Sequence, residues 1–353
     1  MKMKKVLAIA IAMVMVLAAF TGCGNGGNGG AGGAGGNGGD AGNVYTPINV
    51  IIAHTDTSSR STHIWSEWLA EHLEEVAPGR FNVEVFPDGL LGDSPTLYAG
   101  VLLGTVNVAF EMSTVLAAQV GTDEASVIEL PFLYPSYEDW IEGMLNRGGL
   151  DLWNQSLNEV GYHVIDLFYN GMRQVISRDG IYRTSADLAG TRVRIPQNEL
   201  NIMMWQYMGA NPTPMAWGEV VTSLNLGTID ALDHSLGVFA DFNLYEIAPF
   251  LTLTNHSSSP FPVTVSYEWL QAMPADMRAI FEDGVRQMAA QQRAHERQIE
   301  ADHLARFEAA GVEIVALTPA ETEAFIEAVQ PVWNEWRNRV GDELMDAWLA
   351  TRP

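Results

Sequence analysis

Short apolar runs alternate with helical patterns along most of the chain. Ile48–Ala53 forms an apolar-rich run that predicts a buried strand, and residues 64–76 carry apolar side chains at the spacing of an amphipathic helix. Residues 81–85 alternate apolar and polar side chains, as a half-buried strand does. Further strands are expected at 106–110, 162–168, 174–177, 192–195 and 312–317, and helices at 94–103, 137–146, 150–160 and from 319 onward. This order predicts an α/β protein with largely parallel strand pairing.

Three segments between these elements have patterns of their own. Pro131–Leu133 predicts an exposed loop, and Ser185–Leu188 predicts a short helix that Gly190 ends. From Tyr267 to about residue 310 a helical pattern runs with few breakers, beginning with a short piece before Pro274. Even without the first 43 residues, the chain exceeds what one core usually organises, so we expect two lobes and a long helix that crosses both.

The N-terminal segment has the pattern of an export signal. Positive charges at Lys2, Lys4 and Lys5 precede an apolar run over residues 6–20, which is shorter than a membrane-spanning helix needs. The run ends in Phe20-Thr21-Gly22-Cys23, which resembles a bacterial lipobox, where the cysteine is acylated and the bond before it is cut. The resemblance implies a lipoprotein signal peptide over residues 1–22. An ordinary signal peptide followed by a chance cysteine is the alternative.

The next segment, residues 23–43, combines Cys23 with a stretch made almost entirely of Gly, Asn and Ala. Such a composition cannot bury apolar surface, so we expect a flexible tether behind an acylated cysteine. Cys23 is the only cysteine, which excludes an intramolecular disulfide. We therefore expect an extracytoplasmic protein attached to the membrane by an N-terminal lipid.

The charge balance narrows the class of partner. The chain has 43 Asp and Glu residues against 19 Lys and Arg residues, a net charge of −24, and its three lysines all lie in the leader. A field of this sign repels polyanions, so we expect no nucleic-acid partner. It also makes any arginine that points into a cleft conspicuous, because the surrounding field does not itself attract an anion.

Several consecutive motifs resemble the DctP-type solute-binding subunits of tripartite ATP-independent periplasmic (TRAP) transporters. They are Gly171-Met-Arg173-Gln-Val, Asp187-Leu-Ala-Gly190-Thr-Arg-Val-Arg194-Ile-Pro196, Gly209-Ala-Asn-Pro212-Thr-Pro214-Met-Ala-Trp217-Gly-Glu219-Val, Leu224-Asn-Leu-Gly227-Thr-Ile-Asp230 and Leu253-Thr-Asn-His256. The resemblance implies an α/β, two-lobed periplasmic-binding-protein-like fold with a ligand cleft between the lobes. It places a solute-binding domain at 44–353, with lobe I at about 44–170 plus 260–300 and lobe II at about 171–259 plus 301–353.

The same resemblance implies a function. A monomeric chain of this kind captures a small carboxylate and delivers it to a small and a large membrane subunit. Two other classes stay open: a binding protein that presents its ligand to a membrane sensor, and an extracytoplasmic enzyme acting on a small acid. The acid itself stays open among C4-dicarboxylates, 2-keto and 2-hydroxy acids, aromatic acids, sugar acids and amino acids.

Arg194 and Arg173 are the two candidate carboxylate-binding residues. Arg194 ends a predicted strand just before Pro196, and its planar guanidinium matches the two oxygens of a carboxylate. The resemblance implies that Arg194 binds the ligand carboxylate, against the alternative of a surface arginine paired with one of the many acids. It also implies a ligand-proximal role for Arg173, against an ion pair between lobes.

Five further residues are candidate ligand contacts. The resemblance places Trp217 against the ligand, where an aromatic face excludes water, and core packing is the alternative. His234 stands where many members have an asparagine that binds the carboxylate, so a donor is kept while its charge becomes pH-dependent, and a structural histidine is the alternative. Gln197 after Pro196 is a polar wall residue. Ser94 and Met112 fall where the first lobe reaches the ligand.

Motifs of catalysis are missing from the sequence. It contains neither G-x-S-x-G nor G-x-x-x-x-G-K-[ST]. His295-Glu296-Arg-Gln-Ile299 falls short of the zinc motif H-E-x-x-H, because isoleucine stands where the second histidine ligand belongs. We therefore expect a binding protein without a metal, a cofactor or an enzymatic activity.

Overall fold

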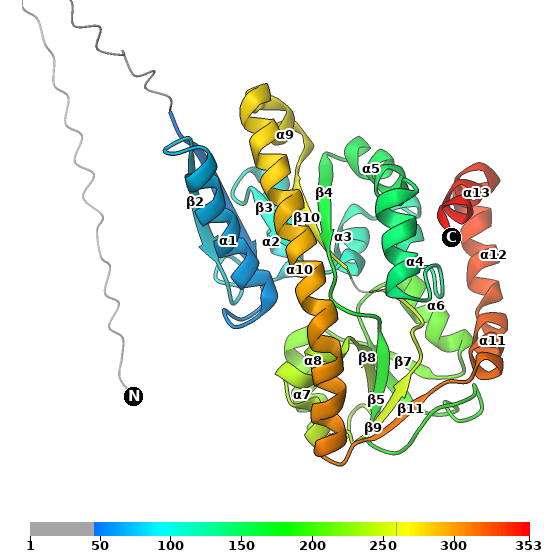
Figure 1. Cartoon of the computed structure of the whole chain (residues 1–353). Helices are drawn as coiled ribbons and strands as arrows, with labels where there is room; N and C mark the ends of the chain where they lie inside the picture. The colour runs from blue at the N-terminus through cyan, green and yellow to red at the C-terminus, as the bar shows by residue number, and fades with distance from the viewer. Residues whose placement is uncertain (1–45, 259) are drawn as a thin grey trace, which may run out of the picture. The chain divides into compact units, whose positions relative to one another are not determined.

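A computed structural model describes residues 46–258 and 260–353. These residues form two mixed β-sheets with helices around them (Figure 1). The predicted signal peptide over 1–22, Cys23 and the tether up to residue 43 lie outside the described residues. No helix in the described ranges is long and apolar enough to cross a membrane.

The first sheet has the strand order β2-β1-β3-β10-β4. Its strands are β1 (Ile48–His54), β2 (Phe81–Phe86), β3 (Val108–Phe110), β4 (Tyr162–Phe168) and β10 (Phe261–Ser266). β1 pairs in parallel with β2 and β3, whereas β10 is antiparallel to both β3 and β4.

The second sheet has the order β11-β9-β5-β8-β6-β7. Its strands are β5 (Gln174–Ser177), β6 (Arg192–Ile195), β7 (Asn211–Pro214), β8 (Ala231–His234), β9 (Phe250–Leu253) and β11 (Glu313–Ala316). β5 is antiparallel to β8 and β9. Five of the nine strand pairs in the described residues are parallel and four are antiparallel, so the prediction of largely parallel pairing is confirmed only in part. The chain passes between the sheets three times, from β4 into β5, from β9 into β10 and through α10 into β11. The strands that follow the first two passages, β5 and β10, form the antiparallel pairs.

The helices cover these sheets. They are α1 (Ser61–Val76), α2 (Ser94–Leu103), α3 (Ser113–Val120), α4 (Tyr137–Ile141), α5 (Gly149–Glu159), α6 (Glu199–Tyr207), α7 (Val220–Leu226), α8 (Leu236–Asp241), α9 (Tyr267–Ala272), α10 (Ala275–Ala309), α11 (Pro319–Ala328), α12 (Gln330–Val340) and α13 (Asp342–Thr351). α12 packs against α6, and α13 packs against α5. The C-terminal helices thus contact elements that accompany both sheets, and the assignment of residues to two lobes stays a prediction.

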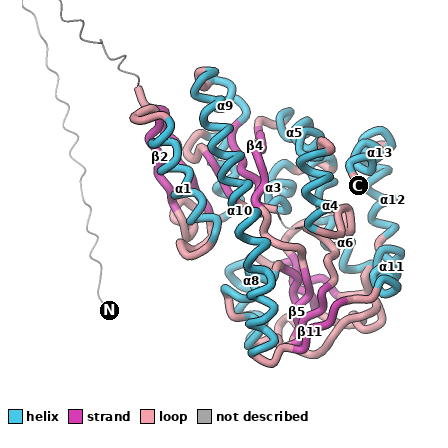
Figure 2. The backbone as a smooth tube through the Cα atoms, in the orientation of Figure 1, coloured by secondary structure: helices cyan, strands magenta, loops and turns pink. Residues whose placement is uncertain are grey.

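Helix α10 links the two sheets, as the long helical pattern predicted. Figure 2 shows it running as one uninterrupted helix past both groups of strands. Phe281 near its start belongs to the core under the first sheet, and Phe307 near its end belongs to the core of the second. In its middle, the Gln292 side-chain amide donates to the Tyr169 carbonyl oxygen over 2.7 Å, which ties the helix to the segment after β4.

Two local predictions are wrong. Phe132 and Leu133 are buried, because the Phe132 N–H donates to the His256 carbonyl oxygen at 2.7 Å and the loop is held against the passage from β9 to β10. No helix forms at 185–188. There residues 185–190 form turns, and Gly190, with φ of 83°, ends the segment before a helix can continue.

Candidate ligand-binding site

A cavity of about 540 Å³ opens between residues of the two sheets. Its lining includes Thr55 after β1, Met112 after β3, Pro196 after β6 and His234 at the end of β8. These positions are the carboxyl ends of parallel strands, where open α/β sheets place their ligands. Six of the seven predicted contacts line this one cavity, namely Ser94, Met112, Arg194, Gln197, Trp217 and His234. Their roles as ligand contacts stay predictions.

Arg194 is a buried cation, and one nitrogen of its guanidinium group has no hydrogen-bond partner. Only 4% of the residue is exposed, and among the described residues no carboxylate lies within ion-pair distance of it. Its Nε and Nη2 donate to the Met215 carbonyl oxygen at 3.2 and 2.7 Å, while Nη1 is buried without a hydrogen bond. Burial, with the nearby Arg173, lowers the pKa of Arg194 to about 10. A buried charge in this state is costly unless an anion joins it.

Aromatic rings cover the guanidinium. The Arg194 Cζ atom lies 5.5 Å from the centre of the Trp217 ring, within the range of a cation–π contact. Trp217 also packs edge-on against Phe242, with ring centres 5.0 Å apart, and both rings line the cavity. An apolar carbon skeleton bound beside Arg194 would therefore lie against an aromatic wall.

His234 sits beside this pair as a neutral donor. Its ring centre lies 5.3 Å from that of Trp217. Burial, followed by the charges of Arg173 and Arg194, holds the pKa of His234 well below its ordinary value, so the ring is uncharged at neutral pH. Nδ1 accepts the Ser235 N–H at 2.9 Å, which leaves the ring proton on Nε2.

Arg173 stands behind this wall and is not among the residues that line the cavity. Its Nε donates to Asp233 Oδ2 at 2.6 Å, and its Nη2 donates to the Asp233 carbonyl oxygen at 2.7 Å. Burial opposes ionisation of Asp233, but Arg173 and a 3.0 Å hydrogen bond with His256 outweigh it and keep the pKa of Asp233 below its ordinary value. Contact between Arg173 and the ligand stays a prediction. In the structure the Arg173 guanidinium is paired with Asp233.

The opposite wall carries Glu111, which the sequence motifs did not single out. Its carboxylate accepts hydrogen bonds from the Thr55 N–H at 2.7 Å, the Thr55 hydroxyl at 2.8 Å and the Ser94 hydroxyl at 2.5 Å. Burial raises the pKa of Glu111 to about 7, and the charge of nearby Asp56 adds to this rise. Asp56 and Asp93 also line the cavity. A carboxylate directly after a buried strand is the sequence signal that would have found Glu111.

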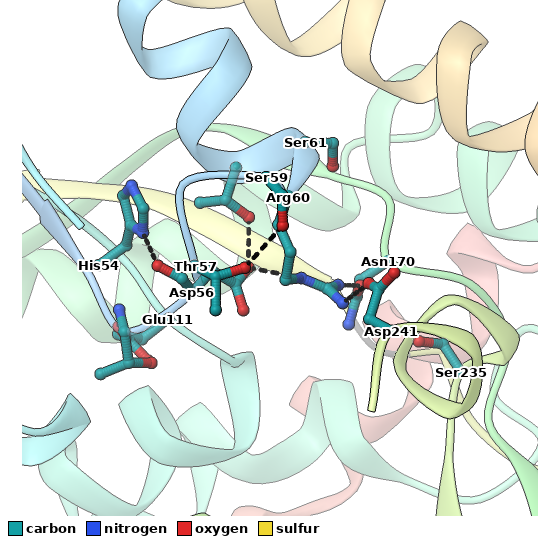
Figure 3. Close-up of polar contacts among 12 residues, drawn as sticks. His54, Asp56, Thr57, Ser59, Arg60, Ser61, Glu111, Asn170, Ser235 and Asp241 are labelled. Atoms are coloured by element: carbon teal, nitrogen blue, oxygen red, sulfur yellow. Dashed lines mark hydrogen bonds and ion pairs between the residues drawn. The ribbon is translucent and has the colours of Figure 1, made fainter. Parts of the chain in front are cut away.

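Arg60 joins three segments at the rim of this wall. Figure 3 shows its side chain extended between Asp56 on one side and Asp241 and Asn170 on the other. Nε lies 3.1 Å from Asp56 Oδ2, Nη2 donates to Asn170 Oδ1 at 3.0 Å, and Nη1 donates to the Asp241 carboxylate. Asp241 ends α8, which belongs with the second sheet, whereas Arg60 directly precedes α1 beside the first. The contact therefore bridges the two sides of the cavity.

Together, the fold and this cavity define a binding protein that holds a small anion between two α/β lobes. Residues 52–339 match the model of the family described as bacterial extracellular solute-binding protein, family 7, or DctP. The chain belongs to this family, which confirms the resemblance stated above and places it among TRAP solute-binding proteins that act outside the cytoplasm.

Relatives and solved structures agree with this assignment. The chain is 28% identical to the 2,3-diketo-L-gulonate-binding periplasmic protein YiaO of Escherichia coli over 76% of this chain and 80% of that protein. It is 24% identical to the C4-dicarboxylate-binding periplasmic protein DctP of Vibrio cholerae, over 84% and 88% respectively. The sugar acid binding protein DctPAm of Advenella mimigardefordensis, solved with galactonate, has the same fold, with a TM-score of 0.79 at 24% identity over 87% of this chain and 98% of that one. The two-lobed α/β prediction is thereby confirmed.

Proposed function

We propose that this chain captures a small organic acid through Arg194 and delivers it to the membrane subunits of a TRAP transporter. One observation carries the proposal: the Arg194 guanidinium is buried in the wall of a cavity with Nη1 unpaired. The names of its relatives support the chemistry, because they describe proteins that bind a diketo sugar acid and C4-dicarboxylates.

The geometry suggests how the acid is held. Met215 occupies the edge of the guanidinium formed by Nε and Nη2, so the end formed by Nη1 and Nη2 remains for a two-point contact with a carboxylate. His234 Nε2–H adds a neutral donor, and Trp217 covers the carbon skeleton. Because water is excluded, the ion pair is stronger than it would be in solution.

Release of the acid depends on the ion pair between Arg60 and Asp241 at the rim of the cavity. The closed arrangement is favoured by ligand contacts from both sides of the cavity and by the Arg60–Asp241 ion pair. When the ligand contacts and this ion pair are lost, the two sides can separate. In this account the chain binds and releases its acid unchanged, without a metal, a cofactor or catalysis.

The remaining parts of the proposal concern residues and partners outside the described structure. Cys23 would carry the lipid and residues 24–43 would act as a tether, so that the binding domain stays near the membrane. The small and large TRAP membrane subunits would receive the ligand from a monomeric binding protein.

Isothermal titration calorimetry with matched ligands tests the proposal. Galactonate and galactitol differ in one end group, a carboxylate against an alcohol, and a wider panel of keto, hydroxy and dicarboxylic acids accompanies them. We expect acids to bind, neutral analogues not to bind, and mass spectrometry to recover the bound acid unchanged. Equal binding of acid and alcohol, or conversion of the acid, would overturn the proposed function.

A further inference from the structure

The charges lining the cavity are unevenly divided between its two sides. Arg194 is the one arginine among the described lining residues, and His234 beside it is uncharged. The other side presents three carboxylates, Asp56, Asp93 and Glu111. A ligand that spans the cavity therefore meets a cation at one end and acids at the other.

Glu111 is the most enclosed of these acids, with 2% of the residue exposed. Its Oε2 accepts hydrogen bonds from Thr55 and Ser94, while Oε1 accepts only the Thr55 N–H. A carboxylate oxygen accepts about two hydrogen bonds, so Oε1 retains one acceptor position. Thr114 adds a buried hydroxyl without a partner to the same cavity. The Thr114 hydroxyl can donate or accept, whereas the open position on Glu111 Oε1 takes only a hydrogen-bond donor.

A second carboxylate fits this side poorly. Burial already raises the pKa of Glu111 to about 7, and another negative charge nearby would raise it further. Glu111 and the ligand carboxylate would then either repel each other without screening by water or bind an extra proton. A ligand hydroxyl has neither cost, because it donates to Oε1 and completes the hydrogen bonding of Glu111.

Resting on the proposed function, we infer that the cavity selects a hydroxylated monocarboxylate, with its carboxylate at Arg194 and a hydroxyl of its far end donating to Glu111. A diacid of the same length is rejected at the Glu111 side. The apolar part of the lining, which includes Val115, Met215 and Trp217, packs on the carbon chain. The ligand class is thus an acid of the aldonate type rather than a dicarboxylate.

Ligand pairs that differ only in their last carbon test this inference. Galactonate and galactarate, gluconate and glucarate, and 4-hydroxybutyrate and succinate each exchange a terminal hydroxyl for a carboxylate. Titration calorimetry with the full chain at about pH 8, where Glu111 is mostly ionised, gives Kd for each. We expect the hydroxy member to bind at least about tenfold more tightly in every pair that binds, because facing like charges are strongly penalised.

A diacid that binds as tightly as its hydroxy partner would overturn the inference and leave the proposed function standing. If no acid of the panel bound better than galactitol, the proposed function would fall, and the inference with it. These outcomes are read on the unaltered protein and need no variant to fold.

Glu111→Gln assigns the selectivity to this residue. The amide keeps the size and an acceptor oxygen but removes the charge, so the preference within each pair should shrink by about tenfold through tighter diacid binding. Glu129→Gln is the control, because Glu129 is equally buried but does not line the cavity, and its preference should match that of the parent. An unchanged preference in Glu111→Gln would overturn the role of Glu111.

Discussion

Glu111 makes the stability of the ligand-free protein depend on pH in a direction opposite to that of most carboxylates. Burial raises its pKa from 4.5 to about 7, so the folded state holds a proton that the unfolded state has released. Between these two values the folded chain binds more protons, and stability therefore falls as pH rises through this window. At about 1.4 kcal/mol for each pH unit, the span from 4.5 to about 7 corresponds to about 3 kcal/mol.

Glu111→Gln isolates this contribution, because glutamine does not titrate in this range and other groups cancel in the comparison. Urea unfolding of parent and variant, between about pH 5 and pH 8, should find the variant gaining about 2.5 kcal/mol relative to the parent as pH rises, because this window covers most of the titration. Ser94→Ala is a second variant for the same unfolding experiment. The Ser94 hydrogen bond lowers the pKa of Glu111, so its loss should steepen the fall of stability with pH. A parent-to-variant difference that stays constant across this range would refute the reasoning.

Three further predictions concern the surroundings of the cavity. Asp233→Ala removes the carboxylate that Arg173 contacts at 2.6 Å and should cost about 3–5 kcal/mol of unfolding free energy in urea titrations, whereas a loss below about 1 kcal/mol would contradict a buried pair. Arg60→Met breaks the bridge to Asp241 and should enlarge the radius of gyration of the ligand-free protein in X-ray scattering; an unchanged profile would count against the bridge. Trp217→Ala should weaken acid binding by about 2 kcal/mol in calorimetry, and parent-like affinity would exclude it from the ligand wall.

Parts of the fold were predictable because they rest on local patterns. The strands at 162–168, 174–177 and 192–195 and the helix at 94–103 form where continuous or periodic apolar runs place them. β7 was missed because Asn211-Pro-Thr-Pro214 has the composition of a turn, and proline is tolerated there only because β7 is an edge strand. The antiparallel pairs were missed because they depend on where the chain passes from one sheet to the other, which local patterns do not show.

The residues of the site were also predictable only in part. The motifs predicted six residues that line one cavity, but Glu111 and Arg60 gain their roles from segments far away in sequence. Arg192 and Arg194 illustrate the limit of periodicity. They stand two residues apart in one strand, so alternation places both side chains on the same face of the sheet. Arg192 is nevertheless 45% exposed and paired with Asp230, whereas Arg194 is buried. Only the surroundings of the strand distinguish an ordinary surface ion pair from an unpaired buried cation.

Affinity measured on Arg194→Ala and Arg192→Ala tests the central claim most directly. Both variants remove one arginine from β6, and the acid that binds most tightly to the parent serves as the probe. Arg194→Ala should lose about 2–5 kcal/mol, which is roughly 30-fold to 5,000-fold in Kd, and Arg192→Ala should bind like the parent. An Arg194→Ala protein that binds the acid as tightly as the parent would contradict carboxylate capture by this residue.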